Sequence, residues 1–198
     1  MKSMIKDAAI LFAITLISGL LLGVVYEVTK EPIAVQKTLR KNKACMEVFQ
    51  DAANFRTLEL AAPESESGEK ATATVNVVSE AVTEDGTVLG YVLDITTHEG
   101  YNGDIQFTMG IRMDGTVNGI SLLSIAETPG LGMKAEEVLK PQFAGKNVSL
   151  FEYTKTGSMS LEQIDAISGA TVTTNAVVNG VNAGLDFFNT QLGGGKDE

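Results

Sequence analysis

The amino-acid sequence predicts an α/β (α+β) domain, an antiparallel sheet with packed helices, attached to one N-terminal transmembrane helix. Three observations predict this fold class. A charge-free apolar stretch lies near the N-terminus, strand-like segments are separated by Asp-Gly turns, and an amphipathic helix lies close to the C-terminus. The length of 198 residues suits one folded domain with an appendage.

The composition excludes several classes of protein. With 15 basic and 25 acidic residues the formal charge is −10, which argues against a nucleic-acid partner, because such surfaces must neutralise phosphates. The single Cys and the single His exclude a disulfide framework, a Cys-rich zinc site and an iron–sulfur cluster held by this chain's thiolates. We therefore expect no protein-bound metal.

The apolar stretch Ala8–Val25 carries no charged side chain. At roughly 1.5 Å per residue it spans roughly 27 Å, close to the ~30 Å of a bilayer core. We predict a transmembrane helix over residues 8–26, with Tyr26 at the interface, after an N-terminal tip of residues 1–7. A cleavable signal peptide is the alternative, but the stretch exceeds a usual apolar h-region and no small-x-small site follows it.

Basic residues flank this segment on both sides, so charge counting does not fix its orientation. Two lysines and the α-amine precede it, and a basic cluster follows it: Lys30, Lys37, Arg40, Lys41 and Lys43. We interpret the cluster as a solvated helix face or as a patch that rests on anionic headgroups.

Residues 27–60 carry apolar side chains at steps of three and four, which predicts a juxtamembrane helical segment. Residues 61–74 are rich in Ser, Glu, Ala and Thr and predict an exposed loop that opens a domain of residues 61–192. Four β-rich segments with turns between them then predict the antiparallel sheet: Val75–Val82, Val88–Thr97, Ile105–Met113 and Thr116–Ile125.

The last part of the chain changes pattern. A short helix over Met133–Leu139 should stop before Pro141, and Val148–Tyr153 suits a strand. In the final helix an apolar stripe and a polar face alternate at helical spacing, and residues 193–198 suit a frayed tail. The stripe consists of Val177, Val178, Val181, Leu185 and Phe188, and the polar face of Asn175, Asn179, Asn182, Asp186 and Asn189.

The most informative segment is DAISGATVTTN, residues 165–175, which lies directly before the final helix, expected to start near Thr173 or Thr174. Its small residues allow a close backbone approach. Its hydroxyls and the first N–H groups of the helix can surround a phosphate. An ordinary N-cap and turn is the alternative, because Ser, Thr and Gly are common at any helix start.

Two weaker segments precede it. In ETPGLG, residues 127–132, one Pro and two Gly allow a tight loop that can lay backbone amides against a planar ligand. In GYNGD, residues 100–104, Tyr101 can stack or donate a hydrogen bond, although a hairpin loop with a surface Tyr explains it equally simply.

In this order the three segments resemble the FMN-binding domain of the membrane subunits RnfG and NqrC. That family carries GYxG, then HxETPGLG, then DxxSGAT on a chain with one anchor. This sequence has GYNGD from Gly100, ETPGLG from Glu127 and DAISGAT from Asp165. The resemblance covers nearly the entire chain, and the length is closer to the RnfG type.

The resemblance implies a covalent cofactor. In the family the last Thr of DxxSGAT is esterified to the phosphate of FMN by the flavin transferase ApbE, with FAD as donor and Mg²⁺ in the transferase. That hydroxyl belongs here to Thr171. Asp165 and Gly169 are implied in transferase recognition and turn geometry, and the other expected cofactor contacts are Tyr101, Glu127, Thr128, Gly130, Leu131, Gly132, Ser168 and Ala170.

The chain departs from the family pattern at Ile125, where the family often has His. A proton-handling role for that His is therefore not carried over. The single His98 lies elsewhere, and we interpret it as an ordinary surface or strand-end residue. Cys45 has no thiol partner in the sequence, and packing is the expected explanation for it.

The resemblance implies an electron-carrying subunit of an Rnf-type complex, which couples ferredoxin and NAD redox chemistry to Na⁺ or H⁺ translocation. The expected partners are the other membrane and peripheral subunits, the transferase ApbE and the lipid bilayer, and the subunit is not expected to be active alone. The flavin domain is expected outside the cytoplasm on a single-pass anchor in the cell membrane. The alternatives are an NqrC-like or other tethered covalent flavoprotein reductase subunit, and a non-enzymatic tethered binding domain in which SGAT is only a helix cap.

Overall fold

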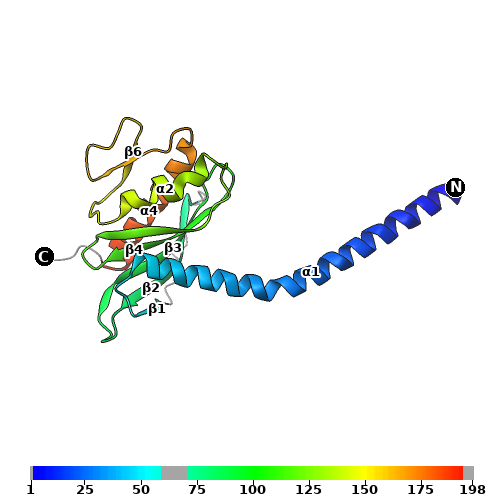
Figure 1. The fold of residues 1–198 in the computed structure, drawn as a ribbon, viewed down its shortest axis with the longest axis horizontal. Helices are drawn as coiled ribbons and strands as arrows, with labels where there is room; N and C mark the ends of the chain where they lie inside the picture. Colours follow the sequence, from blue (N-terminus) through cyan, green and yellow to red (C-terminus); the bar gives the residue numbers. More distant parts are fainter. Residues whose placement is uncertain (1, 59–70, 194–198) are drawn as a thin grey trace. The chain divides into compact units, whose positions relative to one another are not determined.

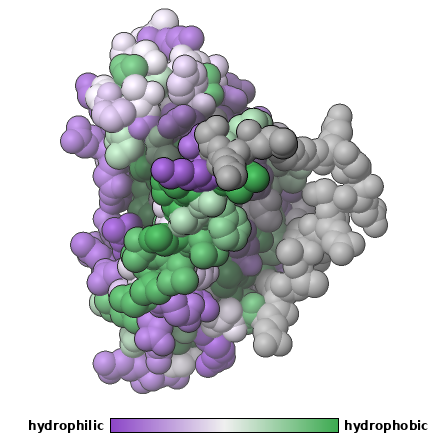
Figure 2. Space-filling model, turned by 90° about the vertical axis from the view of Figure 1, so that its right-hand side faces the viewer, coloured by the Kyte–Doolittle hydropathy of each residue, from purple (hydrophilic) through white to green (hydrophobic). Residues whose placement is uncertain are grey.

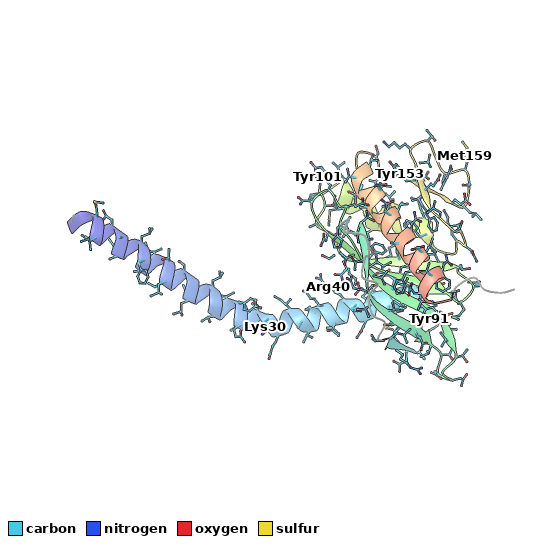
Figure 3. All side chains as sticks on the ribbon, turned by 180° about the vertical axis from the view of Figure 1, so that it is seen from behind. Lys30, Arg40, Tyr91, Tyr101, Tyr153 and Met159 are labelled. Carbon is cyan, nitrogen blue, oxygen red and sulfur yellow. The ribbon has the colours of Figure 1, made fainter. Side chains whose placement is uncertain are left out.

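The structure, a computed structural model, describes residues 2–58 and 71–193. It divides into two units, the first ending at Arg40 and the second beginning at Lys41. Helix α1 covers Lys2–Val48 without interruption and bends near Lys30, two residues before the internal Pro32 (Figures 1 and 3). Pro lacks the N–H of a helix hydrogen bond and crowds the preceding turn, which accounts for a bend at this point.

The N-terminal part of α1 is apolar and exposed. In the part of the chain that the structure describes, α1 is the one helix long and apolar enough to cross a membrane. Its large side chains from Ile10 to Val28 are exposed, and hydrophobic residues gather in one green area of the face drawn in Figure 2. The predicted membrane-spanning helix is thus present.

A five-stranded antiparallel sheet in the order β1-β2-β3-β4-β5 forms the centre of the second unit (Figure 1). Its tight turns place Gly86 and Gly115 at φ 83° and 84°, conformations that favour glycine. The four predicted strands are confirmed, and their neighbour β1 is additional. The strands are β1 Asn54–Leu58, β2 Ala73–Val82, β3 Val88–Thr97, β4 Ile105–Arg112 and β5 Val117–Ser124.

The prediction of helix over residues 27–60 is wrong beyond Val48, where α1 ends. Residues 54–58 pair with β2 instead, with Phe55 opposite Ala81, because a sheet edge offers unpaired backbone groups that the helical pattern does not reveal. Of the loop predicted over residues 61–74, the part up to residue 70 lies outside the described ranges, and β2 already begins at Ala73. Most of the tail predicted over residues 193–198 also lies outside them.

Helix α4, Thr171–Gln191, packs on one face of the sheet. All five residues of the predicted apolar stripe are buried there. A Cβ on Gly180 would lie 2.9 Å from the Phe107 ring, and one on Gly184 would lie 2.7 Å from Ile95 Cδ1. The glycines therefore let the helix backbone approach the strands closely.

Short elements connect β5 to α4: the 3₁₀ turn η1 Gly132–Lys134, then α2 Ala135–Val138, α3 Lys140–Phe143, β6 Glu152–Thr154 and β7 Gln163–Asp165. The first predicted helix is confirmed, but helical structure does not stop before Pro141. That proline occupies the first turn of α3, where its missing N–H costs nothing. The predicted strand over Val148–Tyr153 lies slightly later, as β6 in parallel pairing with β7.

The end of α1 covers the other face of the sheet. Val48 and Phe49 are buried with Cys45, as the packing interpretation of this thiol predicts, and burial raises the pKa of the thiol above its ordinary value. Lys41 Nζ lies 3.1 Å from the buried Asp94 carboxylate. Residues after Arg40 are therefore part of the domain's own packing.

Candidate functional site

A cavity of about 510 Å³ unites the three motif segments GYNGD, ETPGLG and DAISGAT. It lies where the loop after β3, the loop after β5 and the first turn of α4 meet. Tyr101 lies near the start of α4 in Figure 3. The lining residues are Tyr101, Glu127, Thr128, Leu131, Gly132, Gly169, Ala170, Thr171, Val172 and Thr173.

Thr171 is the first residue of α4 and lines the cavity. The helix therefore begins two or three residues earlier than predicted. The residue before it, Ala170, has no side-chain cap among the described residues, and Gly169 has a φ of 78° that glycine adopts without strain. Because the first N–H groups of a helix have no intrahelical acceptor, they remain available to a ligand oxygen beside the Thr171 hydroxyl.

Glu127 forms the inner wall of the cavity and is 4% exposed. Its Oε2 accepts a hydrogen bond from Thr173 Oγ1 at 2.7 Å, and its Oε1 accepts one from the backbone N–H of Asn102 at 3.1 Å. The Asn102 side chain donates a further bond to the Ala126 carbonyl at 2.8 Å. These bonds connect all three segments through one carboxylate.

Two glycines make this close packing possible. A Cβ on Gly132 would lie 2.6 Å from both Glu127 Cβ and Thr173 Oγ1, and one on Gly100 would lie 2.9 Å from Glu127 Oε1. Real Cβ atoms essentially never approach so closely, so the wall requires glycine at both positions. The motifs predicted flexible turns at these glycines, whereas in the structure they leave space for Glu127.

Eight of the eleven predicted site residues line the cavity, and Asp165, Ser168 and Gly130 are not among its lining residues. The Asp165 carboxylate instead accepts a hydrogen bond from the backbone N–H of Ser158 at 2.5 Å. The hydroxyl of Thr174, another candidate phosphate ligand, donates to the Ala170 carbonyl at 2.9 Å and accepts the Ile167 N–H. These two side chains stabilise the chain around the site.

Three residues of the site are absent from the predicted cofactor contacts: Val172, Thr173 and Asn102. Val172 lines the cavity with a side chain that is 48% exposed, and only the correct start of α4 would have revealed its position. Thr173 carries one of the hydroxyls expected near a phosphate but donates it to Glu127. Asn102 contributes a backbone N–H, which any residue except proline could supply, so its type carries no signal.

His98 lies at the end of β3, as expected for a strand-end residue. Its Nδ1 lies 3.0 Å from the Asp104 carboxylate, and its Nε2 lies 3.3 Å from the Thr74 hydroxyl. His98 is not among the residues that line the cavity. No cluster of three or more potential metal ligands occurs within residues 2–58 and 71–193.

Two family models match the chain. An FMN-binding domain matches residues 100–186, which include the entire cavity lining, and an RnfG N-terminal region matches residues 1–48. The chain is 32% identical to the RnfG subunit of the Na(+)-translocating ferredoxin:NAD(+) oxidoreductase complex of Acetobacterium woodii, over 94% of this chain and 92% of that protein.

Other relatives and one solved structure agree. The RnfG subunit of the proton-translocating ferredoxin:NAD(+) oxidoreductase complex of Clostridium ljungdahlii is 30% identical over 96% of this chain and 97% of its own length. NqrC of Shewanella oneidensis has the same fold, with a TM-score of 0.52, 16% identity and coverage of 73% of this chain and 84% of that chain. The chain therefore belongs to the RnfG family of ion-translocating oxidoreductase subunits and carries that family's FMN-binding domain.

Proposed function

We propose that this chain is the electron-carrying RnfG subunit of a membrane-bound, ion-translocating ferredoxin:NAD(+) oxidoreductase complex, with FMN attached covalently to Thr171. One observation carries the proposal. The cavity has the Thr171 hydroxyl at the start of α4, between the two other segments by which the chain resembles flavin-binding subunits. Full-length similarity to RnfG proteins favours this assignment over an NqrC-like reductase subunit, for which the shared fold is the only support.

The residues around the cavity fit FMN. A volume of about 510 Å³ lies within the range of roughly 300–1,000 Å³ for small-molecule sites. The unpaired N–H groups at the start of α4 suit the phosphate, and the partly exposed side chains of Tyr101, Leu131 and Val172 offer apolar surface to the ring system. Bound FMN supplies the electron-transfer chemistry, and the protein binds, orients and shields it.

The proposed attachment needs FAD as a second reactant and a flavin transferase of the ApbE type. The Thr171 Oγ forms a bond to the phosphorus next to the riboflavin part of FAD. The bond from that phosphorus to the bridging oxygen breaks, AMP leaves with this oxygen, and the hydroxyl proton is released. No electrons are exchanged in this step, so the flavin keeps its oxidation state.

The test of attachment uses the full chain produced together with a flavin transferase. Thr171→Ala is expected to abolish flavin fluorescence in a denaturing gel, whereas Thr171→Ser, which keeps a hydroxyl, is expected to retain part of it. Thr190→Ala is the matched control, because Thr190 lies on the same helix far from the cavity and bonds only to the Asp186 carbonyl within the described residues. Covalent flavin on the Thr171→Ala protein would refute the assignment.

We further propose that the flavin domain lies outside the cytoplasm, because a covalent bond retains a cofactor where cytosolic supply is lacking. The side chain of Met159 is 90% exposed, whereas that of Cys45 is 5% exposed. Met159→Cys should therefore react with a membrane-impermeant maleimide on intact cells, while the unsubstituted chain stays unlabelled. Labelling of Met159→Cys only after lysis would place the domain in the cytoplasm.

A further inference from the structure

Glu127 is a buried carboxylate to which the proposed function assigns no role. Within the described ranges, the buried acidic residues are Asp94 and Glu127. Asp94 is neutralised by Lys41 at 3.1 Å. Glu127 forms no ion pair with any residue in those ranges, although it lines the flavin cavity. The two buried carboxylates therefore differ in whether a cation compensates their charge.

The partners of Glu127 are neutral donors. Thr173 donates a hydroxyl hydrogen to one carboxylate oxygen, and Asn102 donates a backbone N–H to the other. Such bonds favour the ionised carboxylate, which is an acceptor only, yet they leave its negative charge in place. Burial of an uncompensated charge is costly, so a merely structural role would be served equally well by a neutral amide.

The carboxylate is also held in one place. Gly100 and Gly132 pack so closely against it that a Cβ on either residue would collide with Glu127 atoms. Its two oxygens are bonded to residues from two different segments, and the backbone of Glu127 itself belongs to the third. A charge fixed in this way keeps a constant distance to whatever occupies the cavity.

We propose that Glu127 sets the reduction potential of the bound flavin. The inference rests on the proposed function, because it assumes that FMN occupies the cavity. Reduction places additional negative charge on the flavin, and a fixed carboxylate in a partly desolvated wall opposes this charge. Glu127 therefore lowers the reduction potential, while its bonds to Thr173 and Asn102 position the cavity wall.

The test compares midpoint potentials of the flavinylated full chain in detergent, with and without Glu127→Gln. Gln has the same shape and can keep both bonds, because the Thr173 hydroxyl can accept the amide N–H and the amide oxygen can accept from Asn102. We expect unchanged flavin attachment and a potential raised by at least about 30 mV, which is a tenfold change for a two-electron couple. Glu152→Gln, an exposed residue outside the cavity lining, is the matched control and should leave the potential unchanged.

Two further variants separate charge from packing. Thr173→Val keeps the charge but removes one bond, and Glu127→Asp keeps the charge on a shorter side chain. If Glu127 were only structural, these variants would shift the potential in the same way as Glu127→Gln. The charge proposal instead predicts an increase in Glu127→Gln alone.

The outcomes are distinguishable. Equal potentials in the unsubstituted and Glu127→Gln proteins, or failure of Glu127→Gln alone to become flavinylated, would overturn the charge proposal and leave the proposed function intact. Absence of covalent flavin from the unsubstituted chain would overturn the proposed function itself. Should Glu127→Gln not fold, a raised potential in Glu127→Asp, which keeps the charge, would also contradict the proposal.

Discussion

Asn182 offers a test of how the polar face of α4 contributes to stability. Its side chain bonds both backbone groups of the buried Phe151: Nδ2 donates to the carbonyl oxygen at 2.9 Å, and Oδ1 accepts the N–H at 2.8 Å. We expect Asn182→Ala to destabilise the domain, because both backbone groups lose their partner while Phe151 remains 1% exposed. Asn189 lies on the same face of the same helix, is exposed, and makes no side-chain hydrogen bond to the described residues.

The magnitude follows from the two bonds. Each contributes about 1 kcal/mol net, and a buried group left unpaired costs about 1–3 kcal/mol, so the loss is about 2 kcal/mol or more. Replacement of Asn by Ala improves helix propensity by about 0.5 kcal/mol, and it does so equally in Asn189→Ala. The difference between the two variants therefore isolates the hydrogen bonds.

Thermal unfolding of the full chain in detergent, followed by circular dichroism, measures this difference. A loss of about 2 kcal/mol corresponds to a Tm lower by about 4–8 °C for a domain of this size. Asn189→Ala should leave Tm unchanged or raise it slightly. Equal melting temperatures for the two variants would refute the reasoning and would mean that water or a rearranged loop replaces the lost partners of Phe151.

Three further predictions concern other contacts. Burial opposes ionisation of Glu47, but hydrogen bonds, the strongest from Lys140, outweigh it and lower its carboxyl pKa. The resulting stability should be present above the ordinary value of 4.5 and lost as pH falls through the lowered pKa. Glu47→Gln should flatten this acid limb in urea unfolding at a cost below about 1 kcal/mol, because its side chain is 40% exposed. Gly110→Ala should cost about 1–3 kcal/mol in the same assay, because its Cβ would lie 2.9 Å from Val48 Cβ. Asp165→Asn should fold by circular dichroism but accept less flavin in the gel assay.

Each of these three predictions has an outcome that would contradict it. An identical pH dependence of the unsubstituted and Glu47→Gln chains would mean that the ion pair contributes nothing to stability. An unchanged free energy of unfolding in Gly110→Ala would show that the end of α1 shifts away from the sheet at no cost. Full flavin attachment to Asp165→Asn would restrict this side chain to its contact with Ser158.

The sequence predicted those parts of the fold in which local pattern and tertiary position agree. The stripe of α4 is buried as its spacing indicated, and Gly86 and Gly115 mark the turns that Asp-Gly pairs suggested. Strand β1 was missed, because three of its five side chains, including those of Asn54 and Arg56, are exposed and carry no β-period of burial. The site was predicted through the order of its motifs, which local sequence carries.

The role of individual side chains was less predictable, because it depends on partners distant in sequence. Asn182 belonged to the predicted polar face, but its bonds to Phe151 cross 31 positions of the chain. Glu127 and Thr173 are 46 positions apart and meet only because α4 packs beside the loop after β5. Spacing within a motif contains no information on such contacts.

The region matched by the RnfG N-terminal model ends at residue 48, but the packing boundary lies between Arg40 and Lys41. The last two turns of α1 therefore serve both the anchor and the folded core. A chimaera that exchanged the anchor at residue 48 would remove Cys45 and Val48 from the domain, whereas exchange before Lys41 would leave its core whole. Evolution meets the same restriction: the bilayer segment can vary freely in sequence, while the turns after Arg40 must change together with the strands they cover.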